Sequence, residues 1–289
     1  MENKKIEDIV FTIFDTETTG DNQKREDRPI EIAAINWNIK NGFIGKPKSW
    51  LVDPKMSIHP SAIAVHGLTD DDVVGKPVLE EIYPELIDYI GDNVLVAHNI
   101  DFDLKMLPKV DELPNKRIDT LRFARHIFNI GDLGYKDHPL YSHKMQELRY
   151  WLNLKVDTMG LSAHRAAADI LVTGLVFNSL ITNLIEKNAD ILYIDELVEF
   201  SSAPILIEKM PFGKYSGVLI EEAIKKEINT PKNYFNWLMK SIKSGEFKID
   251  PDLLFSINYY FKKIGVYADV VDIEKSLKNS RDFKKQVNA

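Results

Sequence analysis

The sequence predicts an α/β fold in which helices flank a mixed β-sheet, followed by a small, mainly helical C-terminal module. Strand-like apolar runs come first, and a further one then alternates with helix-spaced segments, as in a mixed sheet covered by helices. The charge also changes along the chain: residues 1–200 hold 22 Lys and Arg against 33 Asp and Glu, whereas residues 201–289 hold 15 against 11. We therefore expect a domain at 1–187, a linker at 188–208 and a module at 209–289.

The strands are predicted from β-branched, apolar runs of strand length. The first run, DIVFTIFD at 8–15, ends in an acidic turn, as a buried strand does when it delivers side chains to a site at its end. A loop punctuated by Pro and Gly extends from Pro54 to Gly75. Two further runs complete an antiparallel meander with the first, and a short buried strand follows later: 30–37, 43–52 and 93–97.

The helices are predicted from helical spacing of apolar residues. The helix at 79–90 contains Pro84, which we place near a helix start or a kink. Asp119 is the expected N-cap of the helix at 120–128. Other helices are expected at 102–106, 143–153 and 163–186, and, after a glycine-rich turn at 210–217, at 218–228, 234–242 and 252–264. The last fifteen residues are expected to fray.

Length and composition exclude several classes of protein. The 289 residues, 44% of them hydrophobic and 28% charged, fit a globular protein of two domains and argue against disorder and coiled coil. The absence of cysteine excludes disulfides, zinc–thiolate sites and a cysteine nucleophile. No apolar run approaches the roughly 18 residues of a membrane helix, and the charged N-terminus lacks a secretory signal. We therefore expect a cytoplasmic protein with no membrane partner.

Three short segments carry acidic side chains where strands end or helices begin. In FDTETTG, Asp15 and Glu17 are two apart in a strand, so they point to the same face. In AHNIDFD, Asp103 lies in the first turn of a helix that follows a buried strand. In HRAAAD, His164 and Asp169 are five apart, about 140° around a helix, so they share a site only if His164 precedes the regular helix.

Each segment alone also has a structural interpretation: an exposed acidic turn, a helix capped by Asn99 with Phe102 in the core, or a structural histidine. Together they indicate a two-metal phosphoryl-transfer centre. Paired carboxylates repel each other unless a cation neutralises them, and Mg²⁺ and Mn²⁺ prefer oxygen ligands. Two such ions about 4 Å apart would clamp the attacking and leaving oxygens of a phosphodiester. Bound cations would also allow a protein of net charge −7 to handle a polyanion.

These three motifs, in this order, resemble those of the DnaQ-like family of 3′–5′ exonucleases, in the subgroup named for four acids and a histidine. The resemblance covers roughly residues 8–187, including DRPIEI at 27–32 and AVHGLT at 64–69. It implies a ribonuclease H-like fold, His164 as general base, and two divalent cations, Mg²⁺ or Mn²⁺, held by Asp15, Glu17, Asp103 and Asp169. It also implies that the terminal nucleotide is held by Thr16, Thr18, Thr19, His66, His98, Asn99 and Phe102. Asp21 departs from the leucine that many members place against the last base.

The C-terminal segments MPFGKYSG and YFNWL resemble the small module of exonuclease X-like proteins. Basic residues interleaved with aromatic ones suit phosphate contact and base stacking, which makes Lys214, Tyr215 and Trp237 candidate nucleic-acid contacts. An equally weighted interpretation places Phe212, Tyr234 and Trp237 in the core of a module that has little else to bury. The segment FGKYSG lacks the glycine spacing of a phosphate-binding P-loop.

We therefore expect a metal-dependent exonuclease that acts on DNA 3′ ends and releases nucleoside 5′-monophosphates. An RNA-trimming exoribonuclease and a polymerase proofreading subunit are alternatives with the same chemistry. An inactive nucleic-acid-binding module is an alternative of another class, although such proteins normally lose a carboxylate and this chain retains the full set. Strand preference and homo-oligomer formation are left open.

Overall fold

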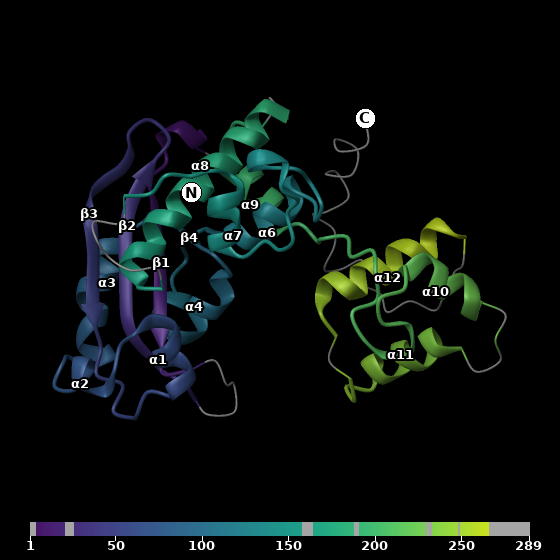
Figure 1. Ribbon diagram of the computed structural model, residues 1–289, viewed down its shortest axis with the longest axis horizontal. Helices are drawn as coiled ribbons and strands as arrows, with labels where there is room; N and C mark the ends of the chain where they lie inside the picture. The colour runs from purple at the N-terminus through teal and green to yellow at the C-terminus, as the bar shows by residue number, and fades with distance from the viewer. Residues whose placement is uncertain are drawn as a thin grey trace. The chain divides into compact units, whose positions relative to one another are not determined.

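The computed structural model describes residues 4–20, 26–157, 164–187, 191–228, 230, 233–247 and 249–265, and the chain divides into two compact units, residues 1–202 and 203–289. The first unit holds a five-stranded sheet of order β3-β2-β1-β4-β5 (Figure 1). β1 pairs antiparallel with β2 and β2 with β3, whereas β4 is parallel to β1 and to β5. The predicted mixed sheet with its meander is confirmed, and its strands are β1 (Phe11–Thr18), β2 (Pro29–Asn38), β3 (Gly42–Leu51), β4 (Val94–Ala97) and β5 (Arg117–Asp119).

Helices pack on both faces of this sheet (Figure 1). α3 and α4 share a hydrophobic core with one face, while α8 contacts β1, β2 and β3 and is flanked by α6 and α7. Asp119 caps α6 by accepting hydrogen bonds from two backbone N–H groups, as predicted. The helices of the first unit are η1 (Ile6–Asp8), α1 (Pro60–His66), α2 (Asp70–Val73), α3 (Leu79–Ile90), α4 (Ile100–Met106), α5 (Pro108–Asp111), α6 (Thr120–Ile127), η2 (Tyr135–Asp137), α7 (Met145–Trp151), α8 (Ala166–Lys187) and α9 (Ile194–Ser202).

The alternation along β1 assigns its side chains to two layers. Phe11 lies against α8, where its ring centroid is 5.1 Å from that of Phe177. Phe14 belongs to the core cluster on the opposite face, with α3 and α4. Because side chains alternate along a strand, Asp15 and Glu17 continue the face that α8 covers. The apolar start of β1 thus builds the core, and its acidic end meets the start of α8.

Helix α9 corrects the prediction of a linker at 188–208. It packs against α6 and β5, with the Phe200 and Phe123 ring centroids 5.4 Å apart, and Leu197 is buried. The first compact unit therefore extends to Ser202. The expected loop at 54–75 contains the short helices α1 and α2, while the short elements β5 and α5 were not predicted.

α8 is more apolar than expected from the sequence analysis, which found no apolar run close to the length of a membrane helix. Among the described residues, the segment Ala166–Glu186 is the one stretch long and apolar enough to cross a membrane, judged by length and composition alone. Within its most apolar window, 67% is buried inside the protein. Three strands on one side and neighbouring helices on the other account for this composition, which is that of a core helix.

The second unit has its own hydrophobic core, built from η3 (Gly213–Tyr215), α10 (Ile220–Glu227), α11 (Tyr234–Lys243) and α12 (Pro251–Lys263). The buried Glu227 carboxylate accepts hydrogen bonds from the Lys214 ammonium, the Tyr215 hydroxyl and the Tyr234 backbone N–H. At Gly213, φ is +75° and an added Cβ would lie 2.3 Å from the Tyr234 hydroxyl, so this position requires glycine. The MPFGKYSG motif therefore builds a turn tied to α10 and α11.

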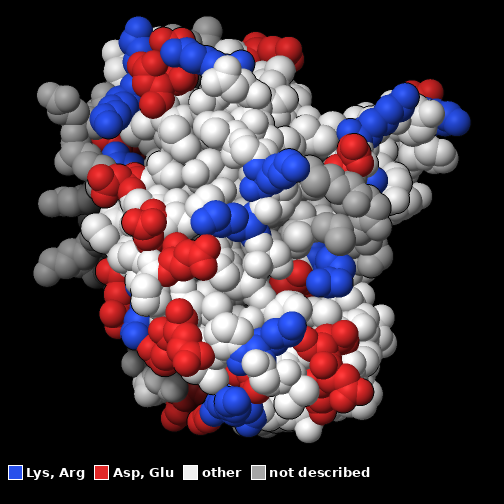
Figure 2. Space-filling view, turned by 90° about the vertical axis from the view of Figure 1, so that its left-hand side faces the viewer, with Lys and Arg blue, Asp and Glu red and all other residues white. Residues whose placement is uncertain are grey.

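Figure 2 shows the molecule from the side on which β3 lies in Figure 1, and acidic and basic side chains are interspersed on this face. One such pair joins Lys48 of β3 to Glu85 of α3, with 3.2 Å between ammonium nitrogen and carboxylate oxygen. Both side chains are about half exposed, so the pair contributes little to stability. Lys48 therefore offers a control position distant in sequence from the acidic motifs.

Candidate active site

β1 and α8 bring three of the predicted carboxylates to one point. Asp15 and Glu17 come from the acidic end of β1, and Asp169 comes from the first turn of α8. Their nearest carboxylate oxygens all lie within 4.8 Å of one another. This spacing lets one cation contact all three side chains, which is the arrangement that hard divalent ions favour.

Asp103 approaches the same strand from α4, which packs on the face of the sheet opposite to α8, so it is not one of the three clustered carboxylates. Its Oδ1 accepts hydrogen bonds from the Thr16 backbone N–H at 2.9 Å and the Thr16 hydroxyl at 2.8 Å. The side chain is 2% exposed, and its charge raises the pKa of Asp15. Asp103 therefore lies beside the three clustered carboxylates, anchored to the residue between Asp15 and Glu17.

His164 precedes α8 by two residues and has a left-handed backbone, with φ of 63°. The charge of His164 and a backbone hydrogen bond from it both lower the pKa of Asp169, against the larger raising effect of burial. The imidazole is exposed and thus open to solvent and substrate. The left-handed turn places His164 outside the regular helix, as the five-residue spacing to Asp169 required.

The carboxylates of this site raise one another's pKa. Burial is the largest cause for Glu17, and with the charges of Asp169 and other acids it raises the pKa of Glu17 to about 8. Burial likewise raises the pKa of Asp103 to about 7. The pKa of Asp15 rises because of burial and then because of the charges of Asp103 and Glu17. A divalent cation would relieve this repulsion, so the oxygen-only donor set fits a hard cation.

The comparisons with known proteins agree with this geometry. A family model described as an exonuclease, RNase T type, matches residues 12–177. The chain belongs to this exonuclease family. The matched region contains β1 from Thr12 onward and the first half of α8, and therefore all four acidic residues and His164.

Two curated relatives match different lengths of this exonuclease. It is 28% identical to exodeoxyribonuclease 10 of Escherichia coli K12 over 253 residues, covering 88% of this chain and 99% of that protein. It is 35% identical to DNA polymerase III subunit epsilon of Treponema pallidum over 188 residues, covering 63% of this chain and 81% of the subunit. The first match is longer than the 202 residues of the first unit, so it includes part of the second unit.

A solved structure, exonuclease X in complex with 5′ overhanging duplex DNA, has the same fold. Its TM-score is 0.53 at 27% sequence identity, covering 66% of this chain and 99% of that one. This neighbour confirms the predicted ribonuclease H-like class of the exonuclease's sheet and flanking helices.

The residues predicted to hold a nucleotide near the first motif form a hydrogen-bonded loop. The Thr18 hydroxyl donates to the Gly20 carbonyl at 2.7 Å, and the Thr19 hydroxyl donates to Asp27 at 3.0 Å. The His66 ring lies 3.2 Å from the Thr18 carbonyl and is buried, which lowers its pKa. His66 thus supports the loop that carries the threonines. Asp21 lies outside the described residues.

The predicted contacts of the second motif differ in exposure. His98 lies against the Thr120 hydroxyl at 3.0 Å, and burial lowers its pKa to about 4, so this imidazole is neutral. Asn99 has φ of 76° and makes no side-chain cap, and its backbone N–H donates to Asp119 at 3.0 Å. Asn99 therefore occupies the N-cap position of α4, as the structural interpretation expected, but its side chain makes no capping hydrogen bond. Phe102 is partly exposed and keeps surface for a ligand.

Sequence reasoning missed three residues that contact or adjoin the site residues. Gln146 of α7 donates its amide to the Asp169 carboxylate at 2.9 Å. Glu31 of β2 is paired with Arg165, the residue that joins His164 to α8. A signal was present for Glu31, because a charged residue inside the apolar run IEIAAI requires a buried partner.

The C-terminal candidates separate into buried and exposed side chains. Tyr215 is 9% exposed, with its hydroxyl on Glu227, so its ring belongs to the core and the prediction of a stacked base there is corrected. Lys214 is exposed but forms an ion pair with Glu227. Trp237 is 56% exposed and keeps a free ring surface.

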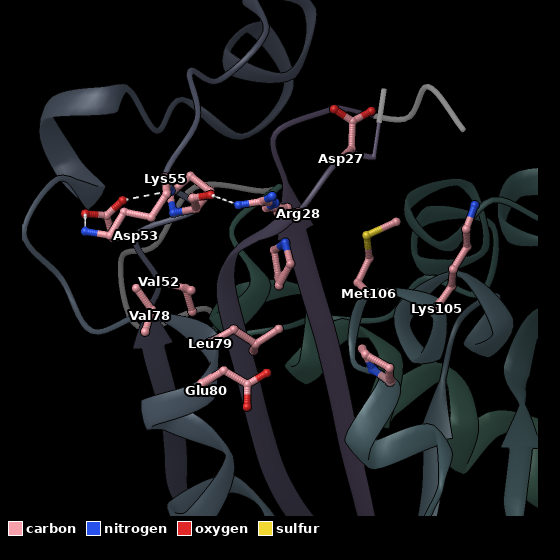
Figure 3. A pocket seen from close by; sticks show the side chains of 13 residues that line it. Asp27, Arg28, Val52, Asp53, Lys55, Val78, Leu79, Glu80, Lys105 and Met106 are labelled. Atoms are coloured by element: carbon pink, nitrogen blue, oxygen red, sulfur yellow. Dashed lines mark hydrogen bonds and ion pairs between the residues drawn. The ribbon is translucent and has the colours of Figure 1, made fainter. Parts of the chain in front are cut away.

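A separate pocket of about 420 Å³ lies between the start of β2, the segment after β3, and helices α3 and α4 (Figure 3). Its lining includes the apolar side chains of Leu79 and Met106 and charged ones such as Arg28 and Lys105. None of the predicted site residues lines this pocket. We therefore assign the chemistry to the acidic cluster and not to the pocket.

Proposed function

We propose that this exonuclease is a metal-dependent 3′–5′ exodeoxyribonuclease that releases nucleoside 5′-monophosphates from DNA ends. The observation that carries the proposal is the convergence of Asp15, Glu17 and Asp169, whose oxygens lie within 4.8 Å of one another. The match to exodeoxyribonuclease 10, which reaches into the second unit, supports DNA as the substrate.

In this proposal Asp15, Glu17, Asp103 and Asp169 would hold two divalent cations, Mg²⁺ or Mn²⁺, which would supply charge neutralisation at the scissile phosphate. The exposed imidazole of His164, next to Asp169, takes the proton from the attacking water. The loop at Thr18 and Thr19 and the partly exposed Phe102 ring position the terminal nucleotide.

A proofreading subunit is the second candidate, because this chain is 35% identical to a polymerase epsilon subunit. That similarity covers 63% of the chain, whereas the similarity to exodeoxyribonuclease 10 covers 88%. The longer match favours an exonuclease that acts by itself.

We also infer that the second unit contacts nucleic acid through α11. Trp237 is 56% exposed, and the exposed Lys240 lies three residues further along the same helix face. The Tyr234 ring lies beside the indole, with 5.7 Å between centroids and 40° between planes. An indole that stacks on a base next to an ammonium that meets a phosphate is a common arrangement for single strands.

The test is shortening of 5′-labelled DNA and RNA oligonucleotides of matched sequence, with single-stranded and duplex 3′ ends. The wild type should shorten DNA from the 3′ end in Mg²⁺ or Mn²⁺ and release 5′-monophosphates, and Lys48→Met should match it. Asp15→Asn should leave the label at full length. Faster shortening of RNA would support the RNA-trimming alternative, and an inactive wild type in both metals would support the inactive binding module.

A further inference from the structure

We infer that Glu31 and Arg165 are a positioning pair that fixes His164 and Asp169 against the strand carrying Asp15 and Glu17. The inference deepens the proposed function and rests on it, because it assigns the pair a role in assembling the proposed active site. Neither residue belongs to the acidic cluster itself.

The Glu31 carboxylate is 1% exposed and receives hydrogen bonds on both oxygens. The Arg165 guanidinium donates from Nε and Nη2, each at 3.0 Å. The Ser49 hydroxyl donates at 2.9 Å and the Ala166 backbone N–H at 3.2 Å. A bidentate pair between a carboxylate and a guanidinium is rigid as well as strong. It therefore fixes both the orientation of the Arg165 side chain and its distance from Glu31.

The position of the pair connects both halves of the site. Glu31 lies directly opposite Glu17 in the β1–β2 register. Arg165 stands between His164 and the first residue of α8, and its carbonyl accepts hydrogen bonds from the N–H groups of Ala168 and Asp169 at 2.8 and 3.0 Å. Any shift of Arg165 along the sheet therefore moves the Asp169 carboxylate relative to Glu17.

A simple structural role would be to fasten α8 to the sheet. The core of the first unit already does this, since α8 packs along β1, β2 and β3 through apolar side chains such as Phe177. The pair instead acts on the first turn, where the functional residues lie. Outer contacts of this kind orient metal-binding side chains, and their loss typically costs 10–100-fold in metal affinity or activity.

The experiment uses the full chain with three variants: Glu31→Gln, Arg165→Met and the milder Arg165→Lys. Mn²⁺ binding is measured without DNA, from the electron paramagnetic resonance signal of free Mn²⁺, and the melting temperature, kcat and KM are measured alongside. Glu31→Gln and Arg165→Met should weaken Mn²⁺ binding about 10–100-fold and lower kcat, with little change in KM. Arg165→Lys should lose less Mn²⁺ affinity and less kcat than Arg165→Met. Lysine keeps the positive charge but cannot donate the two parallel hydrogen bonds of the guanidinium. Lys48→Met should match the wild type.

Folded variants that bind Mn²⁺ and turn over within twofold of the wild type, with only a lower melting temperature, would overturn the inference. If Glu31→Gln or Arg165→Met fails to fold, the Mn²⁺ affinity and kcat of Arg165→Lys test the inference instead. Failure of the proposed function would look different. A wild type that binds Mn²⁺ but leaves DNA intact would reject the proposed exodeoxyribonuclease activity, while the Mn²⁺ affinities would still test the positioning pair.

Discussion

Glu17 shows how a single residue can link this protein's stability to pH. Its pKa of about 8 in the fold lies above the ordinary 4.5, so the native state binds this proton more tightly than the unfolded state. The corresponding stability is present below pH 4.5 and is lost as pH rises towards 8. In EDTA, the melting temperature of the wild type should fall from pH 5 to pH 8 relative to Glu17→Gln. If the difference in melting temperature between the two proteins stayed the same from pH 5 to pH 8, the raised pKa of Glu17 would be contradicted.

Cations should reverse this loss. In the proposed function, Mg²⁺ or Mn²⁺ would bind the ionised carboxylates, so the increase in melting temperature on adding metal should be larger at pH 8 than at pH 5. At a concentration 100 times the dissociation constant, the linkage amounts to about 2.7 kcal/mol. Calorimetry of the wild type and of Asp15→Asn checks it, and an equal increase in both proteins would count against binding at this cluster.

Substitution of His164 is expected to slow the chemical step without weakening metal binding. His164→Ala should lower kcat by about 10²–10⁴-fold, the usual effect of removing a general base, and leave Mn²⁺ affinity nearly unchanged. Single-turnover cleavage and Mn²⁺ titration measure the two effects. Full activity in this variant would remove His164 from the proposed mechanism.

Gln146 acts on one carboxylate through one hydrogen bond. Gln146→Leu removes the donor that lies 2.9 Å from Asp169 and should weaken Mn²⁺ binding and lower kcat by about 10–100-fold. Wild-type affinity in Gln146→Leu would show that Asp169 is oriented without it.

At the scale of elements, the approach of α8 to β1 sets the distance between the two motifs. An added Cβ at Gly174 would lie 2.5 Å from the Phe43 ring and 3.0 Å from Ile13. Gly174→Val should therefore lower the free energy of unfolding by about 1–3 kcal/mol and also reduce kcat. The exposed Asn178 of the same helix gives the control, because Asn178→Ala should change neither quantity in denaturation and cleavage assays.

The elements also show where sequence patterns suffice. The strands of the meander were predictable from their apolar runs, and Asp119 was predictable as a cap because local hydrogen bonds decide caps. The three-residue β5 is too short to show a period, and its pairing with β4 depends on the sheet. α9 was missed because its residues fall in the segment 188–208 that was predicted as a linker, whereas its apolar side packs on α6.

At the scale of the whole molecule, two compact units share one chain, and we assign them different tasks. Trp237→Ala should leave the rate on short oligonucleotides at saturation unchanged and weaken binding of longer single strands by about 1–3 kcal/mol. Fluorescence polarisation and cleavage assays separate these effects. Tyr215→Phe, which keeps the ring and removes its bond to Glu227, should instead lower the melting temperature. Equal DNA affinity in Trp237→Ala and the wild type would reject α11 as a contact surface.

The sequence by itself determined the class of fold, the residue types of a cation site and their order, because strand period, helix period and acidic spacing are local properties. Only the tertiary structure decided that Asp103 is bound to Thr16, that Gln146 holds Asp169 and that Glu31 meets Arg165. These contacts join residues far apart in the chain, and they form only after the strand order and the packing of α4, α7 and α8 bring their elements together.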